Sequence, residues 1–114
     1  MQYLLLIHDD ESQDNGDLMP EYMAYTEELG KSGSLVGANQ LQPSDTATTV
    51  RVRGGETLVT DGPFIETKES LGGYYLVEAG SLDEAIEWAA KIPSARFGHV
   101  EVRPVVMRQA EVSA

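Results

Sequence analysis

The stretch GYYLVEAGSLDEAIEWAAKIP, residues 73–93, decides the fold, because a strand and a helix follow each other in it with clear boundaries. Residues 73–79, GYYLVEA, form a largely apolar run with two tyrosines, which predicts a strand. Ser81 and Glu84 have the spacing of a capping box, which marks the beginning of a helix, and Pro93 ends that helix. A strand that leads into a helix in this way favours a fold in which helices cover a sheet.

The same kinds of signal recur towards both ends of the chain. Further strands are predicted at 2–8, 34–40, 48–53, 56–60 and 99–105, and a first helix at 20–32. Residues 2–8, QYLLLIH, are apolar on both alternating faces, which is typical of a central strand covered on each side. The element order predicts an α+β fold of the ferredoxin-like kind: an antiparallel sheet with two helices on one face. We expect a single domain over residues 1–106 and a C-terminal tail at 107–114.

The sheet face away from the helices is predicted to be only partly polar. Leucines and tyrosines alternate there with Arg51, Arg53, Glu101 and Arg103. Such a face is too apolar for water and too charged for a simple core. We therefore expect a second copy of the chain to cover it, which makes the protein a homodimer.

The composition is that of a folded protein that repels polyanions. The chain has 114 residues, no cysteine, and 19 acidic against 8 basic residues, which gives a net charge of −11. The absence of cysteine excludes disulfides and a thiol nucleophile, and the negative charge makes nucleic acid and anionic membranes poor partners. The apolar run near the N-terminus is too short for a signal peptide or a membrane span, so a cytoplasmic location is predicted. No dinucleotide or phosphate-binding fingerprint is present, and no cofactor is expected.

The segment TDGPFIETKESLGG, residues 60–73, combines a turn with a cluster of charges. Asp, Gly and Pro in succession favour a tight turn at Asp61. Glu66, Lys68 and Glu69 follow within a few residues, and the paired glycines after them allow a ligand or another chain to approach the backbone closely. The cluster can hold a small polar molecule, whereas the simpler interpretation is a turn followed by a salt-bridged loop that organises the dimer.

This segment resembles the signature of the DGPF proteins, a group within the YCII-related family. The similar stretches are DGPFIETKESLGGYYLVEA, LLLI near the start, EELGKSGSLVGANQLQP, TTVRVRGG and IPSARFGHVEVRPV, which together run from about residue 1 to 106. The resemblance implies a dimeric α+β barrel, in which two ferredoxin-like sheets face each other. It also implies a functional link to extracytoplasmic-function sigma factors, with which the genes of many members are associated. On the matching positions, it implies that Asp61, Glu66, Lys68 and Glu69 line a pocket.

The wider YCII group uses a His and Asp pair as its proposed active site and includes a dehydrochlorinase of chlorinated hydroxyquinols. The helical position at which that group has its histidine corresponds here to Tyr22 or Tyr25, so the pair is not carried over intact. For this chain we predict Asp61 as an acid or base, with His8 as a proton-relay partner near neutral pH. Arg51 or Lys68 would steady a developing anion.

The other candidate residues have simpler interpretations. His99 lies beside Glu101 on the polar face of its strand, where a surface or dimer-contact role is expected. Consecutive side chains on an extended chain point to opposite sides, so residues 8–11, His-Asp-Asp-Glu, cannot all converge on one metal ion, and no metal site is expected.

Two functions remain open at this point. The first is a cofactor-free lyase or isomerase that uses acid–base chemistry on a small molecule around the DGPF motif. The alternative is a ligand-binding or regulatory module, associated with a sigma factor, that does not turn its ligand over. The sequence does not decide between them.

Overall fold

The computed structural model describes residues 1–108 of the chain. Of the tail predicted at 107–114, Met107 and Arg108 have no regular secondary structure, and residues 109–114 lie outside the described part. No helix within residues 1–108 is long and apolar enough to cross a lipid bilayer.

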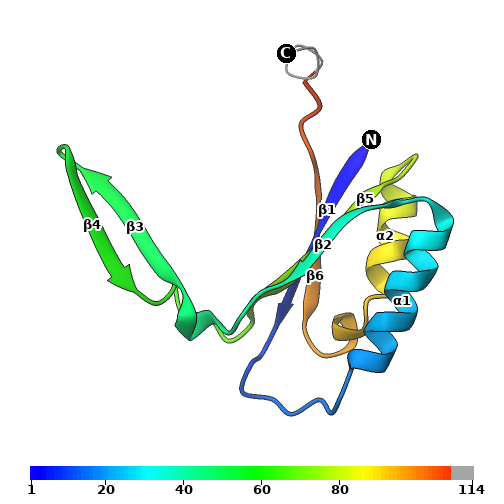
Figure 1. The fold of residues 1–114 in the computed structure, drawn as a ribbon, viewed down its shortest axis with the longest axis horizontal. Coiled ribbons are helices and arrows are strands. Elements are labelled where there is room, and N and C mark those ends of the chain that lie inside the picture. Colours follow the sequence, from blue (N-terminus) through cyan, green and yellow to red (C-terminus); the bar gives the residue numbers. More distant parts are fainter. Residues whose placement is uncertain (109–114) are drawn as a thin grey trace.

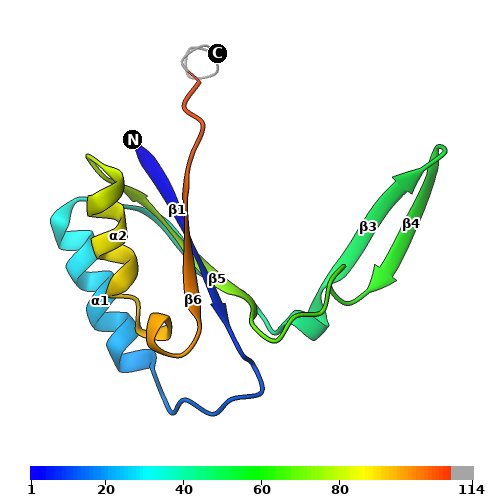
Figure 2. The ribbon, with the colours of Figure 1, turned by 180° about the vertical axis from the view of Figure 1, so that it is seen from behind.

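The chain folds into a four-stranded sheet with two helices and a separate two-stranded ribbon (Figure 1). The elements in chain order are β1 (Gln2–Asp9), α1 (Met19–Ser32), β2 (Leu35–Gln40), η1 (Ser44–Thr46), β3 (Thr48–Arg53), β4 (Glu56–Asp61), β5 (Ser70–Glu78), α2 (Leu82–Ala90), η2 (Pro93–Arg96) and β6 (His99–Pro104). The four-stranded sheet has the order β2-β5-β1-β6, and its paired strands are antiparallel. Both helices lie on one face of it, as Figure 2 shows from behind. The predicted α+β, ferredoxin-like architecture is confirmed.

The core lies between this sheet and the helices. Side chains of β1 alternate between buried and half-buried, and the buried ones, Tyr3, Leu5 and Ile7, face the helices. The remaining buried apolar residues come from the helices, β5 and the segments that follow them: Tyr25, Leu29, Tyr75, Val77, Ala79, Ala85, Ala89 and Ile92. The central position of β1 is therefore the one that its apolar pattern predicts.

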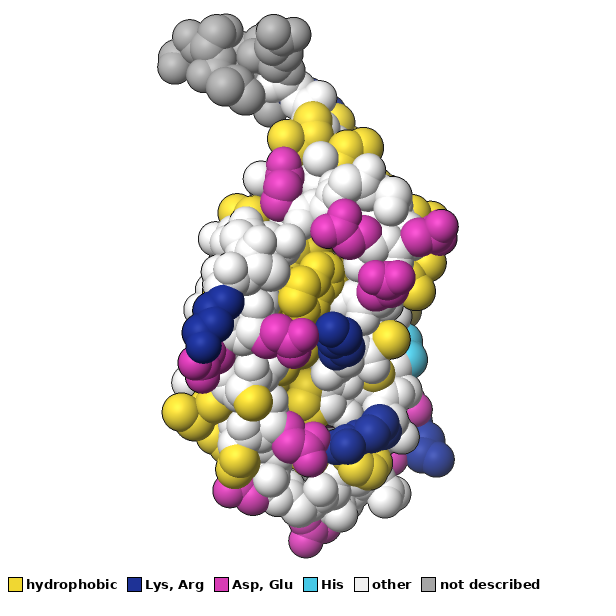
Figure 3. Space-filling view, turned by 90° about the vertical axis from the view of Figure 1, so that its right-hand side faces the viewer, with side chains coloured by type: hydrophobic (Ala, Val, Ile, Leu, Met, Phe, Trp, Pro, Cys, Tyr) yellow, Lys and Arg dark blue, Asp and Glu magenta, His cyan; other side chains and the backbone are white. Residues whose placement is uncertain are grey.

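The ends of the helices follow from local chemistry. Pro20 stands in the first turn of α1, and Gly33 ends the helix in the left-handed conformation, at φ 84°. Ser81 caps α2, because its side-chain oxygen accepts a hydrogen bond of 3.2 Å from the Glu84 backbone N–H. The Glu84 carboxylate accepts a bond of 2.7 Å from the Gly80 N–H in return. On the side of the molecule that carries the helices, acidic and basic side chains are mixed around an apolar strip (Figure 3).

Strands β3 and β4 form a hairpin, here called the arm (residues 48–61), that leaves the four-stranded sheet. Gly54 and Gly55 form its turn, both at positive φ, which suits the right-handed twist of a two-residue hairpin. The arm points away on the side opposite the helices (Figure 1). The expectation that Arg51 and Arg53 lie on the uncovered face of one continuous sheet is therefore wrong, because these residues belong to the arm.

The sheet surface opposite the helices, here called the open face, carries Leu4, Leu6 and Leu76, which are half-buried by their neighbours. Sheet and arm diverge from a common base, with the arm on the side of the open face (Figures 1 and 2). The radius of gyration of 16.4 Å exceeds the value of about 13 Å expected for a compact chain of this length. This extended shape is the consequence of the arm.

Candidate functional site

An open hollow of about 1050 Å³ lies at one end of the helix–sheet layer and is here called the Asp9 cavity. It lies between the first half of α1, the loop at 10–18 and the adjoining ends of β2 and β5. Its walls combine apolar side chains with hydroxyl and carboxyl groups, among which Asp9, Tyr22, Thr26, Tyr75 and Ser94 carry the polar chemistry. The loop at 10–18, which has no apolar pattern, is thus one wall of the site.

Asp9 is the last residue of the central strand β1, and a β-bulge in the neighbouring strand β5 determines which residue lies beside it. The pairing of β1 with β5 shifts between Ile7 and His8, so that Gly72 is the extra residue on β5. A Cβ atom on Gly72 would lie 3.2 Å from Asp9 Oδ1, which means that this carboxylate packs directly over the glycine. Burial raises the pKa of the Asp9 carboxyl above its ordinary value, and the negative charges of Glu11 and Glu69 raise it further. A carboxyl with a raised pKa is better suited to exchange protons near neutral pH.

Across the cavity, α1 and η2 supply a pair of hydroxyl groups. The Tyr22 hydroxyl donates a hydrogen bond of 2.6 Å to Ser94 Oγ, and Ser94 is buried. Burial raises the pKa of the Tyr22 phenol, and the charge of Asp9 is among the smaller causes in the same direction. A second bond of 2.7 Å joins Thr26 Oγ1 and the Tyr75 hydroxyl. Of the two tyrosines that could occupy the family's histidine position, Tyr22 lines the cavity, whereas Tyr25 is buried in the core.

The Asp9 carboxyl makes the stability of the fold depend on pH. A carboxyl whose pKa is higher in the folded chain favours folding while it is protonated, and this contribution is lost as the pH rises through the folded value. We therefore expect Asp9→Asn, which stays neutral, to raise the melting temperature at pH 7 and to leave it unchanged near pH 3. The exposed Asp45→Asn is the control, with little change at either pH. Thermal unfolding followed by circular dichroism at several pH values measures this, and a lower melting temperature for Asp9→Asn at pH 7 would contradict it.

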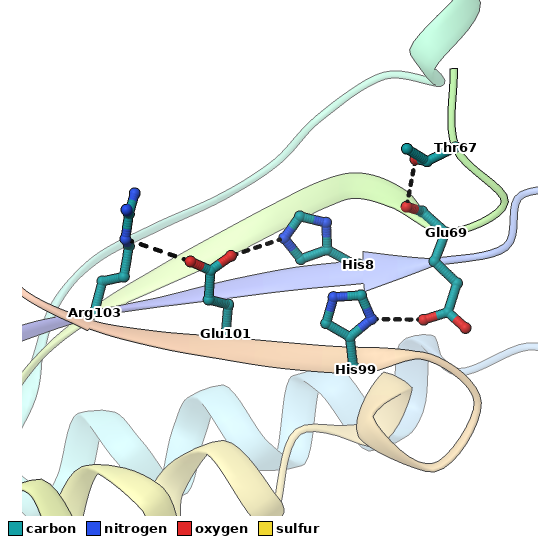
Figure 4. Close-up of polar contacts among 6 residues, drawn as sticks. All are labelled: His8, Thr67, Glu69, His99, Glu101 and Arg103. Atoms are coloured by element: carbon teal, nitrogen blue, oxygen red, sulfur yellow. Dashed lines mark hydrogen bonds and ion pairs between the residues drawn. The ribbon is translucent and has the colours of Figure 1, made fainter. Parts of the chain in front are cut away.

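A second polar cluster lies on the open face, at the same end of the sheet (Figure 4). The rings of His8 and His99 are stacked, with centroids 4.6 Å apart and planes 3° from parallel. His99 Nδ1 lies 2.6 Å from Glu69 Oε1, and His8 Nε2 lies 3.7 Å from Glu101 Oε1, which is beyond hydrogen-bond distance. Glu101 also contacts Arg103 Nε, at 3.3 Å. His8 and Asp9 are consecutive residues of one strand, so they place an imidazole and a carboxyl on opposite sides of the sheet.

The residues predicted from the DGPF segment are distributed over three places. Asp61 and Arg51 are exposed on the arm, where the Arg51 guanidinium lies 5.1 Å from the centre of the Phe64 ring. Glu66 is exposed in the loop that leads from the arm to β5. Lys68 lines a shallow hollow together with the acidic residues at 10–11.

The described contacts bring two of the predicted site residues together. Glu69 and His8 meet through His99, which stands between the carboxylate and the other imidazole. Asp61 belongs to the two-stranded ribbon and His8 to the four-stranded sheet, and no contact between them occurs within residues 1–108 of one chain. A relay between Asp61 and His8 stays a prediction that concerns the assembled protein.

Sequence reasoning missed Asp9, Tyr22 and Ser94 as one polar site. They come from a strand end, a helix and a 3-10 turn, and only folding brings them to one cavity. The available signal was the position of Asp9 directly after the apolar run predicted as a strand at 2–8. Within residues 1–108 there is no group of three or more His, Asp or Glu side chains arranged to hold a metal ion.

Comparison with known proteins gives relatives in sequence and in structure. The family model described as YCII-related domain matches residues 1–108. An uncharacterized protein of Rhizobium meliloti (strain 1021) is 37% identical over 116 residues, which cover 94% of this chain and 94% of the relative.

A solved structure with the same fold is that of 5-chloro-2-hydroxyhydroquinone dehydrochlorinase from Burkholderia phenoliruptrix AC1100, in complex with 2,5-dihydroxybenzoquinone. Its TM-score is 0.60 and its identity 17%, over 96% of this chain and 98% of that chain. At this identity the likeness shows the fold.

Proposed function

The chain belongs to the YCII-related family, and from this premise we propose that it binds and converts a small organic molecule in the Asp9 cavity. The observation that carries the proposal is the Asp9 carboxyl, with its raised pKa, in a cavity whose opposite wall presents the Tyr22 and Ser94 hydroxyls. We infer a cofactor-free lyase or isomerase, because proton transfer is the chemistry that a carboxyl and a phenol can supply by themselves.

The ligand class follows from the groups in the cavity. The Tyr22 hydrogen is donated to Ser94, so the phenol oxygen can accept a hydrogen bond from a ligand hydroxyl. The apolar part of the wall, which includes Leu18 and Met23, suits a flat ring. A small hydroxylated aromatic or quinone fits both features, and the dehydrochlorinase of the same fold is known in complex with such a molecule.

In the proposed reaction the Asp9 carboxylate takes a proton from the bound ligand. The proton either returns to another atom of the ligand, which gives an isomerase, or leaves with a departing group, which gives a lyase. For a reaction at the DGPF segment instead of the Asp9 cavity, Lys68 and Arg51 stay candidates for steadying a negative charge, and Glu66 and Glu69 for binding the ligand. Asp61 and His8 stay candidates for an acid–base pair that is completed in a homodimer, in which two open faces pack together as a dimeric α+β barrel.

The proposal is tested with 2,5-dihydroxybenzoquinone as the probe and isothermal titration calorimetry as the measurement. We expect Tyr22→Phe to weaken binding about 10-fold, because the ligand loses one hydrogen bond while the ring stays in place. Asp9→Asn should keep binding within about 10-fold and abolish turnover of a hydroxyquinol, since the amide cannot take the proton. Asp45→Asn, outside the cavity, is the control and should behave as the wild type.

The same assay separates the two candidate acids. Turnover that survives Asp9→Asn and disappears in Asp61→Ala would move the chemistry to the DGPF segment. An unchanged affinity in Tyr22→Phe would show that the ligand does not bind in the Asp9 cavity.

A regulatory role is the alternative, and one observation favours it. The helix position at which the family has its histidine holds a tyrosine, Tyr22 or Tyr25, and a phenol does not take part in proton transfer at neutral pH as readily as an imidazole. In that case the cavity would bind a ligand without converting it, and the protein would act together with an extracytoplasmic-function sigma factor. Tight probe binding without turnover, combined with direct association of the purified protein with such a sigma factor, would favour this alternative.

A further inference from the structure

The arm is a ribbon with two different faces. In its register Val50 pairs with Val59 and Val52 with Thr57, and these side chains share one face, here called the valine face. The opposite face carries the pair of Arg51 with Leu58 and the pair of Arg53 with Glu56. The three valines are 59%, 58% and 63% exposed in the order Val50, Val52, Val59.

A ribbon of this kind needs another surface to pack against. A two-stranded hairpin alone is marginally stable in water, and β-branched side chains favour strands when they pack against another surface. Every residue of β4, and all but one of β3, is exposed within the described chain. The valine face is therefore an unpartnered apolar surface.

Hydrogen bonds at the base of the arm connect its two ends to each other and to the body. The Gly62 N–H donates a hydrogen bond of 2.7 Å to the Ala47 carbonyl, which closes the ribbon at its root. The Glu11 carboxylate accepts a bond of 2.7 Å from the Ser44 N–H before the arm, and one of 3.1 Å from Ser70 Oγ after it. Both ends of the ribbon are thus tied to the same loop of the body.

The shape of the chain indicates what covers the arm. The arm leaves the body on the side of the open face, whose leucines are also left without a covering element within residues 1–108 (Figure 1). A second copy placed against the open face by a two-fold axis would cover this face and bring each arm onto the other subunit. One symmetric contact then buries the open face and the valine face of both subunits.

We propose that the arm of each subunit packs against the other subunit of the homodimer, with its valine face on the partner. Asp61 lies on the same face of the arm, two residues beyond Val59, so in the dimer its carboxylate is directed at the partner subunit, whose open face carries the histidine cluster (Figure 4). This inference rests on the homodimer of the proposed function. It explains why Asp61 has no contact with His8 of its own chain.

The proposal is tested on single-cysteine variants of the full chain, because the protein has no cysteine of its own. Val59→Cys and Thr60→Cys place one thiol on each face of the arm, at neighbouring positions that are both exposed in the single chain. We expect the thiol at Val59→Cys to react at least about 10-fold more slowly with a thiol reagent when the protein is dimeric. Thr60→Cys is the matched control and should react at the same rate in monomer and dimer.

A charge on the valine face gives the complementary measurement. Val59→Glu should raise the dimer dissociation constant at least about 100-fold by analytical ultracentrifugation, and Thr60→Glu should change it by less than about 3-fold. Equal reactivity of the two thiols in a dimer, or equal dissociation constants of the two glutamate variants, would overturn the arm contact and leave the dimer intact. A monomer at all concentrations would overturn the dimer as well, whereas probe binding in the Asp9 cavity is measured separately and decides the proposed function.

Discussion

Gly98→Ala is expected to lower the free energy of unfolding by at least about 3 kcal/mol, and the melting temperature by more than about 10 °C. A Cβ atom at this position would lie 2.1 Å from the His8 carbonyl oxygen and 2.9 Å from the Asp9 Cα. Both are backbone atoms of the central strand, so no side-chain rotation relieves the clash, and β6 must move away from the end of β1. Chemical denaturation followed by tryptophan fluorescence measures the loss.

Gly30→Ala is the matched control for this substitution. Gly30 lies within α1, where an added Cβ would have only one neighbour, Leu35 Cδ2, at 4.0 Å. Alanine favours the helical conformation over glycine, so this variant should gain about 0.5–1 kcal/mol. If Gly98→Ala unfolds at the same denaturant concentration as the wild type, the close approach of β6 to β1 is not a feature of the protein in solution.

Leu29→Ala is expected to cost about 2–5 kcal/mol of folding free energy. Leu29 is completely buried between α1 and the sheet, and the smaller side chain would leave a cavity that its neighbours fill only in part. The same helix carries Tyr22 and Thr26, so a loosened α1 should also weaken binding in the Asp9 cavity. Denaturation and probe titration on the same sample measure the two effects.

Met23→Ala provides the comparison on the same helix. Met23 is 66% exposed and lines the cavity, so its truncation should change stability by no more than about 0.5 kcal/mol and affect ligand binding alone. A loss of stability equal to that of Leu29→Ala would mean that α1 packs on the sheet through a different side.

The local signals in the sequence were sufficient for the six strands and the two α-helices, but not for the 3-10 helices η1 and η2. The end of α2 also differs from the prediction, because the helix ends at Ala90 and Pro93 begins η2. Alternation or apolar runs mark the strands, and the capping pair Ser81 and Glu84 marks the beginning of α2 as the structure has it. These signals involve residues close together in the chain, so they are independent of how distant segments meet. The central position of β1 was predictable for the same reason, because both of its faces are apolar.

The placement of the arm was not predictable from the same signals. Alternating valines and arginines in 48–53 look alike in a sheet edge and in a separate ribbon, because both have one apolar and one polar face. The difference lies in whether β2 pairs with β3 or with β5, and this choice depends on the packing of the whole chain.

The candidate site shows the same limit. The charged residues after Asp61 are close in sequence and were therefore singled out, yet folding spreads them over the arm, a loop and the body. Asp9 and Ser94 are far apart in the sequence. They line one cavity because η2 lies against α1, where Ser94 is hydrogen-bonded to Tyr22. Proximity along the chain was thus a poor guide to proximity in the cavity.

The hydrogen bond between Ala47 and Gly62 joins the two ends of the arm at its root, so the arm is a module that leaves the body at one place. Its length and side chains can therefore vary among related proteins while the helices and the four-stranded sheet keep their geometry. In a cell that holds several such proteins, arms of different sequence would favour dimers of identical subunits over mixed dimers. Exchanging residues 48–61 between two relatives would then exchange their pairing preference.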